Sequence, residues 1–205
     1  FAAVGKMMRM KNFSAVLVLA TLAACTSAPE QRLTVPRAPV ETKLRIAFAS
    51  VALREVSLPG YAAGEDVYLS DAAGVLRTQP GLFWADDPSR AITLELSRHL
   101  AQITGARIAA EPWPFGGFPE AQVEVRVEEM LAQEGGMFRL AGQYFVSSET
   151  GRARAQLFDL SVSLPLEAGA TAIAAAREAG ALTVGVANNG ATLLLEAADH
   201  GILAE

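Results

Sequence analysis

The sequence predicts a single α/β domain in which a mixed, largely antiparallel sheet packs against two main helices. Apolar residues recur at helical spacing in residues 92–103, and apolar and polar residues alternate in residues 123–127. A second segment with helical spacing, rich in alanine, follows Pro165. With 205 residues, of which 51% are hydrophobic, the chain can bury a sizeable core, and we place the domain at residues 43–205.

The first part of the domain predicts three short strands. Residues 43–48 alternate between apolar and other side chains, which indicates a strand with one buried face. The segment Leu58-Pro59-Gly60-Tyr61 predicts a turn, and we expect the hydroxyl of Tyr61 to reach a backbone group. Residues 67–69 and 75–77 flank a glycine-containing turn, so we expect them to form a hairpin.

The main helix is expected to begin at Pro88 and to end before Gly105. Proline suits the first helical position because its missing N–H would be unpaired there anyway, and Asp87 can cap the free amides. Leu94 lies off the apolar stripe and predicts a second contact, with its own chain or with a partner. We place Trp84, just before the helix, in the core. The stripe predicted for the core is Ile92, Leu96, Leu100 and Ile103.

The rest of the domain predicts a short strand, an aromatic loop, an antiparallel meander and a last helix. Residues 112–119 contain three prolines and two glycines among three aromatic residues and cannot form regular structure. Their side chains Trp113, Phe115 and Phe118 either cover the sheet or form an exposed contact for another protein. The expected strands are 106–110, 123–127, 137–147 and 154–164, and the expected helix is 173–194.

Residues 1–24 predict upstream residues followed by a secretory signal. A short basic region precedes the apolar run 13–22, which is too short to span a bilayer. The run ends in Leu22-Ala23-Ala24-Cys25, which resembles the lipobox of bacterial lipoproteins, where the cysteine is acylated and becomes the mature N-terminus. The alternative is an ordinary cleaved signal in which Cys25 has no role. We expect an acylated Cys25 and a flexible tether over residues 25–42.

Composition argues against several classes of function. After the first 24 residues the net charge is 14 − 22 = −8, which disfavours a nucleic-acid binder and broad adhesion to anionic lipid. Cys25 is the only cysteine, and His99 and His200 are the only histidines. We therefore expect no metal site, no cofactor and no catalytic site. The neighbouring carboxylates at 86–87 and 128–129 are expected to be helix caps or to point to opposite faces of a strand.

The order of these segments resembles the ABC-type transport auxiliary lipoprotein family, the PqiC-like proteins. A lipobox is followed by a strand and the turn Leu58-Pro59-Gly60-Tyr61, then by two short strands. Trp84-Ala85-Asp86 then opens the main helix, before the meander and the last helix. The similarity spans about residues 43–195, and its best local signatures are Leu58, Pro59, Tyr61 and Trp84.

The resemblance implies a lipid-anchored accessory, on the periplasmic face of a bacterial membrane, of a system with an MCE-domain protein and an ABC-type permease. Such systems are associated with phospholipids or other hydrophobic molecules. In related lipoproteins an aspartate directly after the cysteine signals inner-membrane retention, and Thr26 at this place favours the outer membrane. Two alternatives stay open: a lipoprotein that scaffolds or activates a cell-wall enzyme, and a carboxylate-dependent hydrolase. A homo-oligomer is also open.

Overall fold

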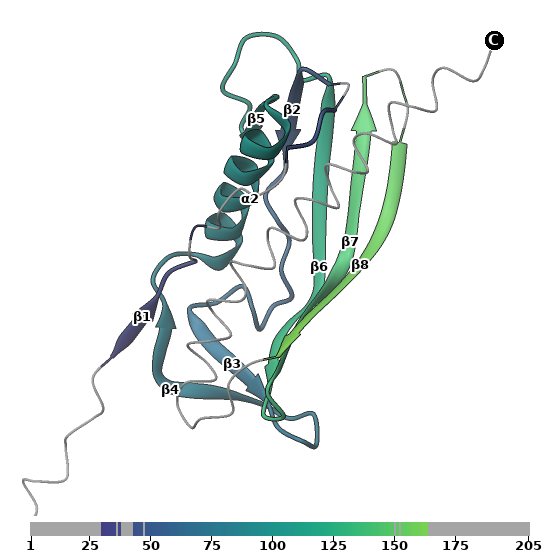
Figure 1. Ribbon diagram of the computed structural model, residues 1–205. Coiled ribbons are helices and arrows are strands. Elements are labelled where there is room, and N and C mark those ends of the chain that lie inside the picture. The colour runs from purple at the N-terminus through teal and green to yellow at the C-terminus, as the bar shows by residue number, and fades with distance from the viewer. Residues whose placement is uncertain are drawn as a thin grey trace, which may run out of the picture. The chain divides into compact units, whose positions relative to one another are not determined.

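The computed structural model describes residues 30–35, 37, 43–46, 48–149, 151 and 153–163. The chain divides into two compact units, residues 1–30 and 31–205, and the elements described here lie in the second. They form one eight-stranded mixed sheet and one helix (Figure 1). Their bounds are β1 (Gln31–Leu33), β2 (Ser50–Leu53), β3 (Asp66–Ser70), β4 (Leu76–Trp84), α2 (Pro88–Thr104), β5 (Arg107–Ala110), β6 (Ala121–Gln133), β7 (Met137–Ser148) and β8 (Ala153–Ser163).

Strand β6 is the centre of the sheet because both of its edges are paired. Along one edge it pairs antiparallel with β7 over its whole length. Along the other edge it pairs first with β2, then with Ser57 through a single bridge, and then with β3. All three pairings are parallel. Residues 50–70 therefore follow β6 from its first residue to its last.

The expectation of a largely antiparallel sheet is wrong. Four strand pairings are parallel (β1–β4, β2–β5, β2–β6 and β3–β6), and three are antiparallel (β3–β4, β6–β7 and β7–β8). The antiparallel pairs are the local hairpins that alternation and turn residues predict. The parallel pairs join segments far apart in sequence, and each needs a crossover connection that no local pattern reveals.

Helix α2 begins and ends where the sequence predicts. The side chain of Asp87 accepts a hydrogen bond from the backbone N–H of Arg90 at 2.8 Å, and Gly105 ends the helix in the left-handed conformation. All four residues of the predicted stripe are buried in the core, with Trp84 beside them. Thr93 is also buried, and its hydroxyl accepts from the amide of Val56 at 2.8 Å. The helix is thus fixed to the chain that follows β2.

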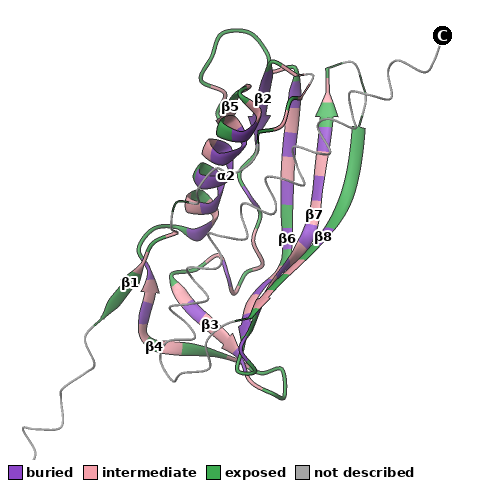
Figure 2. Cartoon of the chain, viewed as in Figure 1, coloured by how far each residue is buried: buried purple, intermediate pink, exposed green. Residues whose placement is uncertain are grey.

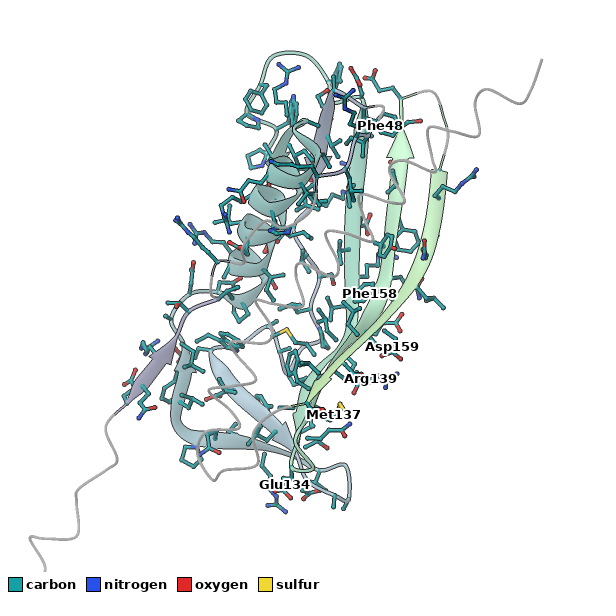
Figure 3. The ribbon with its side chains drawn as sticks, in the orientation of Figure 1. Phe48, Glu134, Met137, Arg139, Phe158 and Asp159 are labelled. Atoms are coloured by element: carbon teal, nitrogen blue, oxygen red, sulfur yellow. The ribbon has the colours of Figure 1, made fainter. Side chains whose placement is uncertain are left out.

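Burial alternates along β6 and β7, as the sequence predicts for the meander (Figure 2). On the inner face the rings of Tyr144 and Phe158 stack at 5.9 Å. Gly142 lies beside them at the bulge in β6, where a Cβ atom would come within 2.2 Å of a backbone oxygen. On the outer face Arg139 pairs with Glu129 and with Asp159, which lies beside it in Figure 3. The hydrogen bonds from Arg139 hold the pKa of Asp159 below its usual value.

The folded domain starts earlier than the predicted residue 43. Residues 31–33 form β1, which pairs parallel with the end of β4. The carbonyl of Leu33 accepts from Ala85 at 2.7 Å, just before α2, and the amide of Leu44 donates to Ile103 at 2.8 Å, at the end of α2. Leu33 and Leu44 thus bond near the two ends of the helix, and we call the described residues of the segment 31–46 the strap. Leu94 is 47% exposed and lines, with residues 33–35, a pocket of about 350 Å³, so its second contact stays a prediction.

Two further expectations have different outcomes. The strand expected at 43–48 is wrong, because its described residues form no strand and β2 begins at Ser50. Leu44 instead bonds the last turn of α2, where helix carbonyls lack partners within the helix, and Lys43 donates to Gln102 there at 2.7 Å. The second helix, expected at 173–194, lies outside the described residues.

The buried stripe of α2 gives the first prediction. Replacing Leu96 by alanine is expected to lower the free energy of unfolding by about 2–5 kcal/mol, because truncation of a buried leucine loses transfer energy and leaves a cavity. The matched control is Leu94→Ala on the same helix, which is expected to cost about 0.5 kcal/mol or less. Urea unfolding of both variants measures the difference. Equal losses would place the stripe outside the core.

Candidate functional site

The aromatic loop, residues 111–120, lies at one end of the sheet. It joins β5 to β6, and these two strands pair with opposite edges of β2, so the loop has to cross the end of β2. Figure 1 shows it as the long teal loop at the top of the molecule. A crossover of this kind cannot hydrogen-bond as a strand, and its prolines and glycines suit that position.

Both ends of the aromatic loop are fixed by hydrogen bonds to the chain around β2. The amide of Glu111 donates to the carbonyl of Leu53 at 2.9 Å. The carboxylate of Glu120 accepts from the amide of Ala49 at 2.7 Å, and the amide of Glu120 donates to the hydroxyl of Ser50 at 3.2 Å. The loop is therefore held at two points on a buried strand, and its aromatic residues lie between them.

The three aromatic residues of the loop differ in exposure. Trp113 is half-buried and contacts the edge of Phe115, with ring centroids 4.9 Å apart. Phe115 is 41% exposed, and the guanidinium of Arg107 lies 5.4 Å from its ring centroid. Phe118 is 88% exposed, the largest value among the exposed large hydrophobic residues described. The guanidinium of Arg107 over the ring of Phe115, with the exposed ring of Phe118 on the same loop, makes a surface that is apolar and carries a positive charge.

The structure thus divides the three predicted contact residues. It brings Trp113 and Phe115 together as a pair that packs on the loop itself, and it leaves Phe118 in solvent. Sequence analysis missed Arg107, because an arginine at the start of a short strand carries no local signal of the ring that it will cover. The Nε1 atom of Trp113 is buried without a hydrogen-bond partner among the residues described.

The signature residues of the turn at 58–61 have a structural role. Between Ser57 and β3 the edge of β6 has no strand partner, and the hydroxyl of Tyr61 accepts from the amide of Met130 there at 3.2 Å. This confirms the expected contact of Tyr61 with a backbone group. Burial raises the pKa of Tyr61, which keeps the hydroxyl neutral. Leu58 and Pro59 are partly buried beside it.

The neighbouring carboxylates are occupied by structural contacts. Asp86 pairs with Arg90 one turn into α2, while Asp87 caps the helix. On β6, Glu128 accepts from the side chain of Gln143 at 2.7 Å, and Glu129 pairs with an arginine of β7. Asp86 and Asp87 line one open pocket of about 290 Å³ with Arg32 and Glu65, but each already has a partner in the helix. No group of three possible metal ligands occurs within the described part of the chain.

His99 is buried in the helix rather than at its surface. It is 1% exposed, and burial lowers its pKa because the charged imidazolium would lose its hydration. Its Nδ1 atom lacks a hydrogen-bond partner among the described residues, and no nucleophile or carboxylate is bonded to it there. His99 is therefore a core residue. In the same described ranges, no helix has the length and apolar character needed to cross a membrane.

Comparison with known proteins adds a family and a fold. A family model described as the ABC-type transport auxiliary lipoprotein component matches residues 32–185. A search of curated proteins found no match. A crystal structure described as that of an uncharacterized protein is similar with a TM-score of 0.63 and 13% identity, covering 79% of this chain and 99% of that one. A DUF330 protein of Xanthomonas campestris gives 0.58 and 13%, covering 87% and 98%. The two TM-scores show a shared fold, and at 13% identity they show the fold alone.

The hydrogen bond of Tyr61 gives the second prediction. Tyr61→Phe removes the acceptor of the Met130 amide and is expected to lower the free energy of unfolding by about 1–2 kcal/mol, as the loss of a partner for a shielded donor does. Tyr68→Phe removes the same atom from the ring that packs edge-on against Tyr61, and serves as the matched control. Chemical denaturation measures both variants. An equal effect would show that the hydroxyl of Tyr61 contributes nothing specific.

Proposed function

Because the chain belongs to the ABC-type transport auxiliary lipoprotein family, we propose that it is a membrane-anchored, non-catalytic accessory subunit of an envelope transport system. The observation that carries the proposal is the family match, which runs from Arg32 in β1 to residue 185 and so includes every element from β2 to β8. The system would contain an MCE-domain protein and an ABC-type permease. Its cargo would be phospholipid or another hydrophobic molecule.

Acylation of Cys25 is the proposed anchor. The sequence Leu22-Ala23-Ala24-Cys25 follows a short apolar run, and the family is described as one of lipoproteins. Two or more acyl chains on one residue hold a protein at a bilayer, where a single chain is marginal. We place the anchored domain on the periplasmic face of a bacterial membrane, with the outer membrane favoured.

A docking role suits the chemistry of the described residues better than catalysis does. The carboxylates that stand side by side in sequence are used for capping and ion pairs. The aromatic loop, in contrast, presents Phe118 and Phe115 to solvent on a backbone fixed at both ends. Aromatic residues on a rigid support are typical of interface hot spots, because little conformational entropy is lost when they bind. We propose this loop as the contact for a protein of the transport complex.

The anchor gives the third prediction. Mass spectrometry of the mature protein extracted from membranes is expected to find an N-terminal Cys25 that carries acyl chains. Cys25→Ala is expected to give an unacylated protein that no longer fractionates with membranes. An unmodified cysteine, or a mature chain that starts elsewhere, would contradict the anchor.

The aromatic loop gives the fourth prediction. A triple variant, Trp113→Ala with Phe115→Ala and Phe118→Ala, is expected to reduce co-purification of the transport components at least tenfold, because the loss of a hot-spot cluster costs about 2 kcal/mol or more. Leu157→Ala, which removes an apolar side chain on β8 that is 71% exposed, is the control and is expected to leave capture unchanged.

The triple variant has to be shown to fold before its binding is interpreted. Its thermal unfolding is compared with that of wild type, and only the cooperative, folded protein is assayed. Undiminished capture by such a protein would exclude the loop as the contact, without bearing on the transport role itself. Loss of capture in the Leu157→Ala control as well would point to a general effect of surface truncation.

A further inference from the structure

We propose that the end of the sheet formed by the β3–β4 and β6–β7 turns rests against the lipid surface, and that the aromatic loop is held away from it. We call residues 71–75 and 134–137 at these turns the hairpin end. The inference rests on the proposed anchoring of Cys25. It follows from the strap, which leaves very little free chain between the anchor and the sheet.

The free chain between anchor and sheet is short. A tether that ran from Cys25 to residue 42 would have 17 residues after the cysteine and a reach of about 60 Å at full extension. Because Gln31 is already paired with Leu82 in the sheet, only six residue steps separate Cys25 from the folded domain. At about 3.3–3.6 Å per residue they span at most about 20 Å, whatever path they take.

The strand registers show which end of the sheet receives this short chain. Leu69 of β3 lies opposite Ala132 of β6, and Asp66 of β3 lies opposite Phe83 of β4. Since Gln31 is paired one residue before Phe83, β1 lies close to the level of residue 130, near the end of β6. The aromatic loop joins β6 at its first residue, nine residues away, or about 30 Å along the strand.

The direction of β1 leads to the same end. Strand β3 is parallel to β6, β4 is antiparallel to β3, and β1 is parallel to β4. Strand β1 therefore runs opposite to β6, so that Gln31 is the end of β1 nearer to the hairpin end. An anchor on that chain pulls the hairpin end towards the membrane and leaves the aromatic loop farther away than the free chain can reach.

The hairpin end carries exposed apolar side chains that suit a lipid interface. Val75 is 50% exposed at the β3–β4 turn and Met137 is 39% exposed at the β6–β7 turn. The two turns are linked, because the amide of Glu134 donates to the carbonyl of Ser70 at 2.9 Å. Figure 3 shows Met137 and Glu134 together at this end, with Phe48 at the other end of the sheet.

The hairpin end is also rigid enough to present these side chains. The carboxylate of Asp71 accepts from the amides of Ala73 and Val75 at 3.0 and 2.9 Å, which fixes the turn. Those hydrogen bonds lower the pKa of Asp71. Two apolar side chains bind a bilayer weakly on their own, but an anchor within about 20 Å of Gln31 keeps them at high effective concentration near the bilayer. A weak contact is then enough to set the orientation of the domain.

Fluorescence quenching in vesicles tests the orientation. Val75→Cys and Phe118→Cys variants of the acylated full chain are labelled with an environment-sensitive probe, which is selective because acylation blocks the thiol of the only native cysteine. The proteins are reconstituted into phosphatidylcholine vesicles with a quencher on the headgroups. Quenching is expected to be at least threefold stronger at position 75 than at position 118. Equal quenching, or stronger quenching at 118, would overturn the proposal.

A spacer insertion tests the cause of that difference. Twenty glycine and serine residues placed between Ser27 and Ala28 lengthen the free chain without touching β1, and they are expected to abolish most of the difference between the two positions. A difference that survives the insertion would contradict the role of the short connection. If Val75→Cys does not fold, Met137→Cys replaces it, since it lies at the same end with similar exposure.

Two measurements on the same samples separate this inference from the proposed function. Mass spectrometry of each preparation shows whether Cys25 is acylated, and a missing acyl group would overturn both proposals. Capture of the transport components is measured in parallel. Normal capture together with equal quenching at 75 and 118 would overturn the orientation alone.

Discussion

Backbone pairing on both edges of β6 is the constraint on which the rest of the structure depends. One edge is taken by β7 along its full length. The other edge is shared by β2, Ser57 and β3, and the hydroxyl of Tyr61 occupies the gap that they leave at Met130. Because buried backbone groups have to be paired, this edge determines the path of residues 50–70. That path also fixes α2 through Thr93, which accepts the amide of the residue before Ser57.

The described polar groups serve this framework rather than a reaction. Asp87 caps a helix, Asp71 fixes a turn, and Arg139 bridges two strands to Glu129 and Asp159. Backbone amides lower the pKa of Asp71, and the guanidinium of Arg139 lowers the pKa of Asp159, because hydrogen bonds to a carboxylate favour its charged form. Exposed apolar side chains lie at both ends of the sheet, with Phe115 and Phe118 at one end and Val75 and Met137 at the other, and such side chains suit contact with other molecules.

Local patterns predicted the elements whose contacts are local. The limits of α2 follow from Asp87 and Gly105, and the meander follows from alternation and turn glycines. The parallel pairings could not be predicted, because nothing in residues 50–53 specifies that they will lie between β5 and β6. The strand expected at 43–48 failed for a related reason. Its alternation correctly signals one buried side, but Leu44 packs and bonds at the end of a helix rather than in the sheet.

The sequence predicts that the candidate site is a loop, but it does not predict which side chains of the loop are exposed. Proline and glycine exclude regular structure at 112–119, yet only the fold decides that Phe115 is covered by Arg107 while Phe118 is bare. Strand β1 could not be predicted either, because it has only three residues and lies in a proline-containing segment typical of a tether. Its pairing with Leu82 depends on the fold. That short pairing changes the function argued for the chain. It shortens the chain between the proposed anchor at Cys25 and the sheet from 17 residues to six residue steps, so that the pairing of β1 with β4 sets where the proposed anchor would hold the domain.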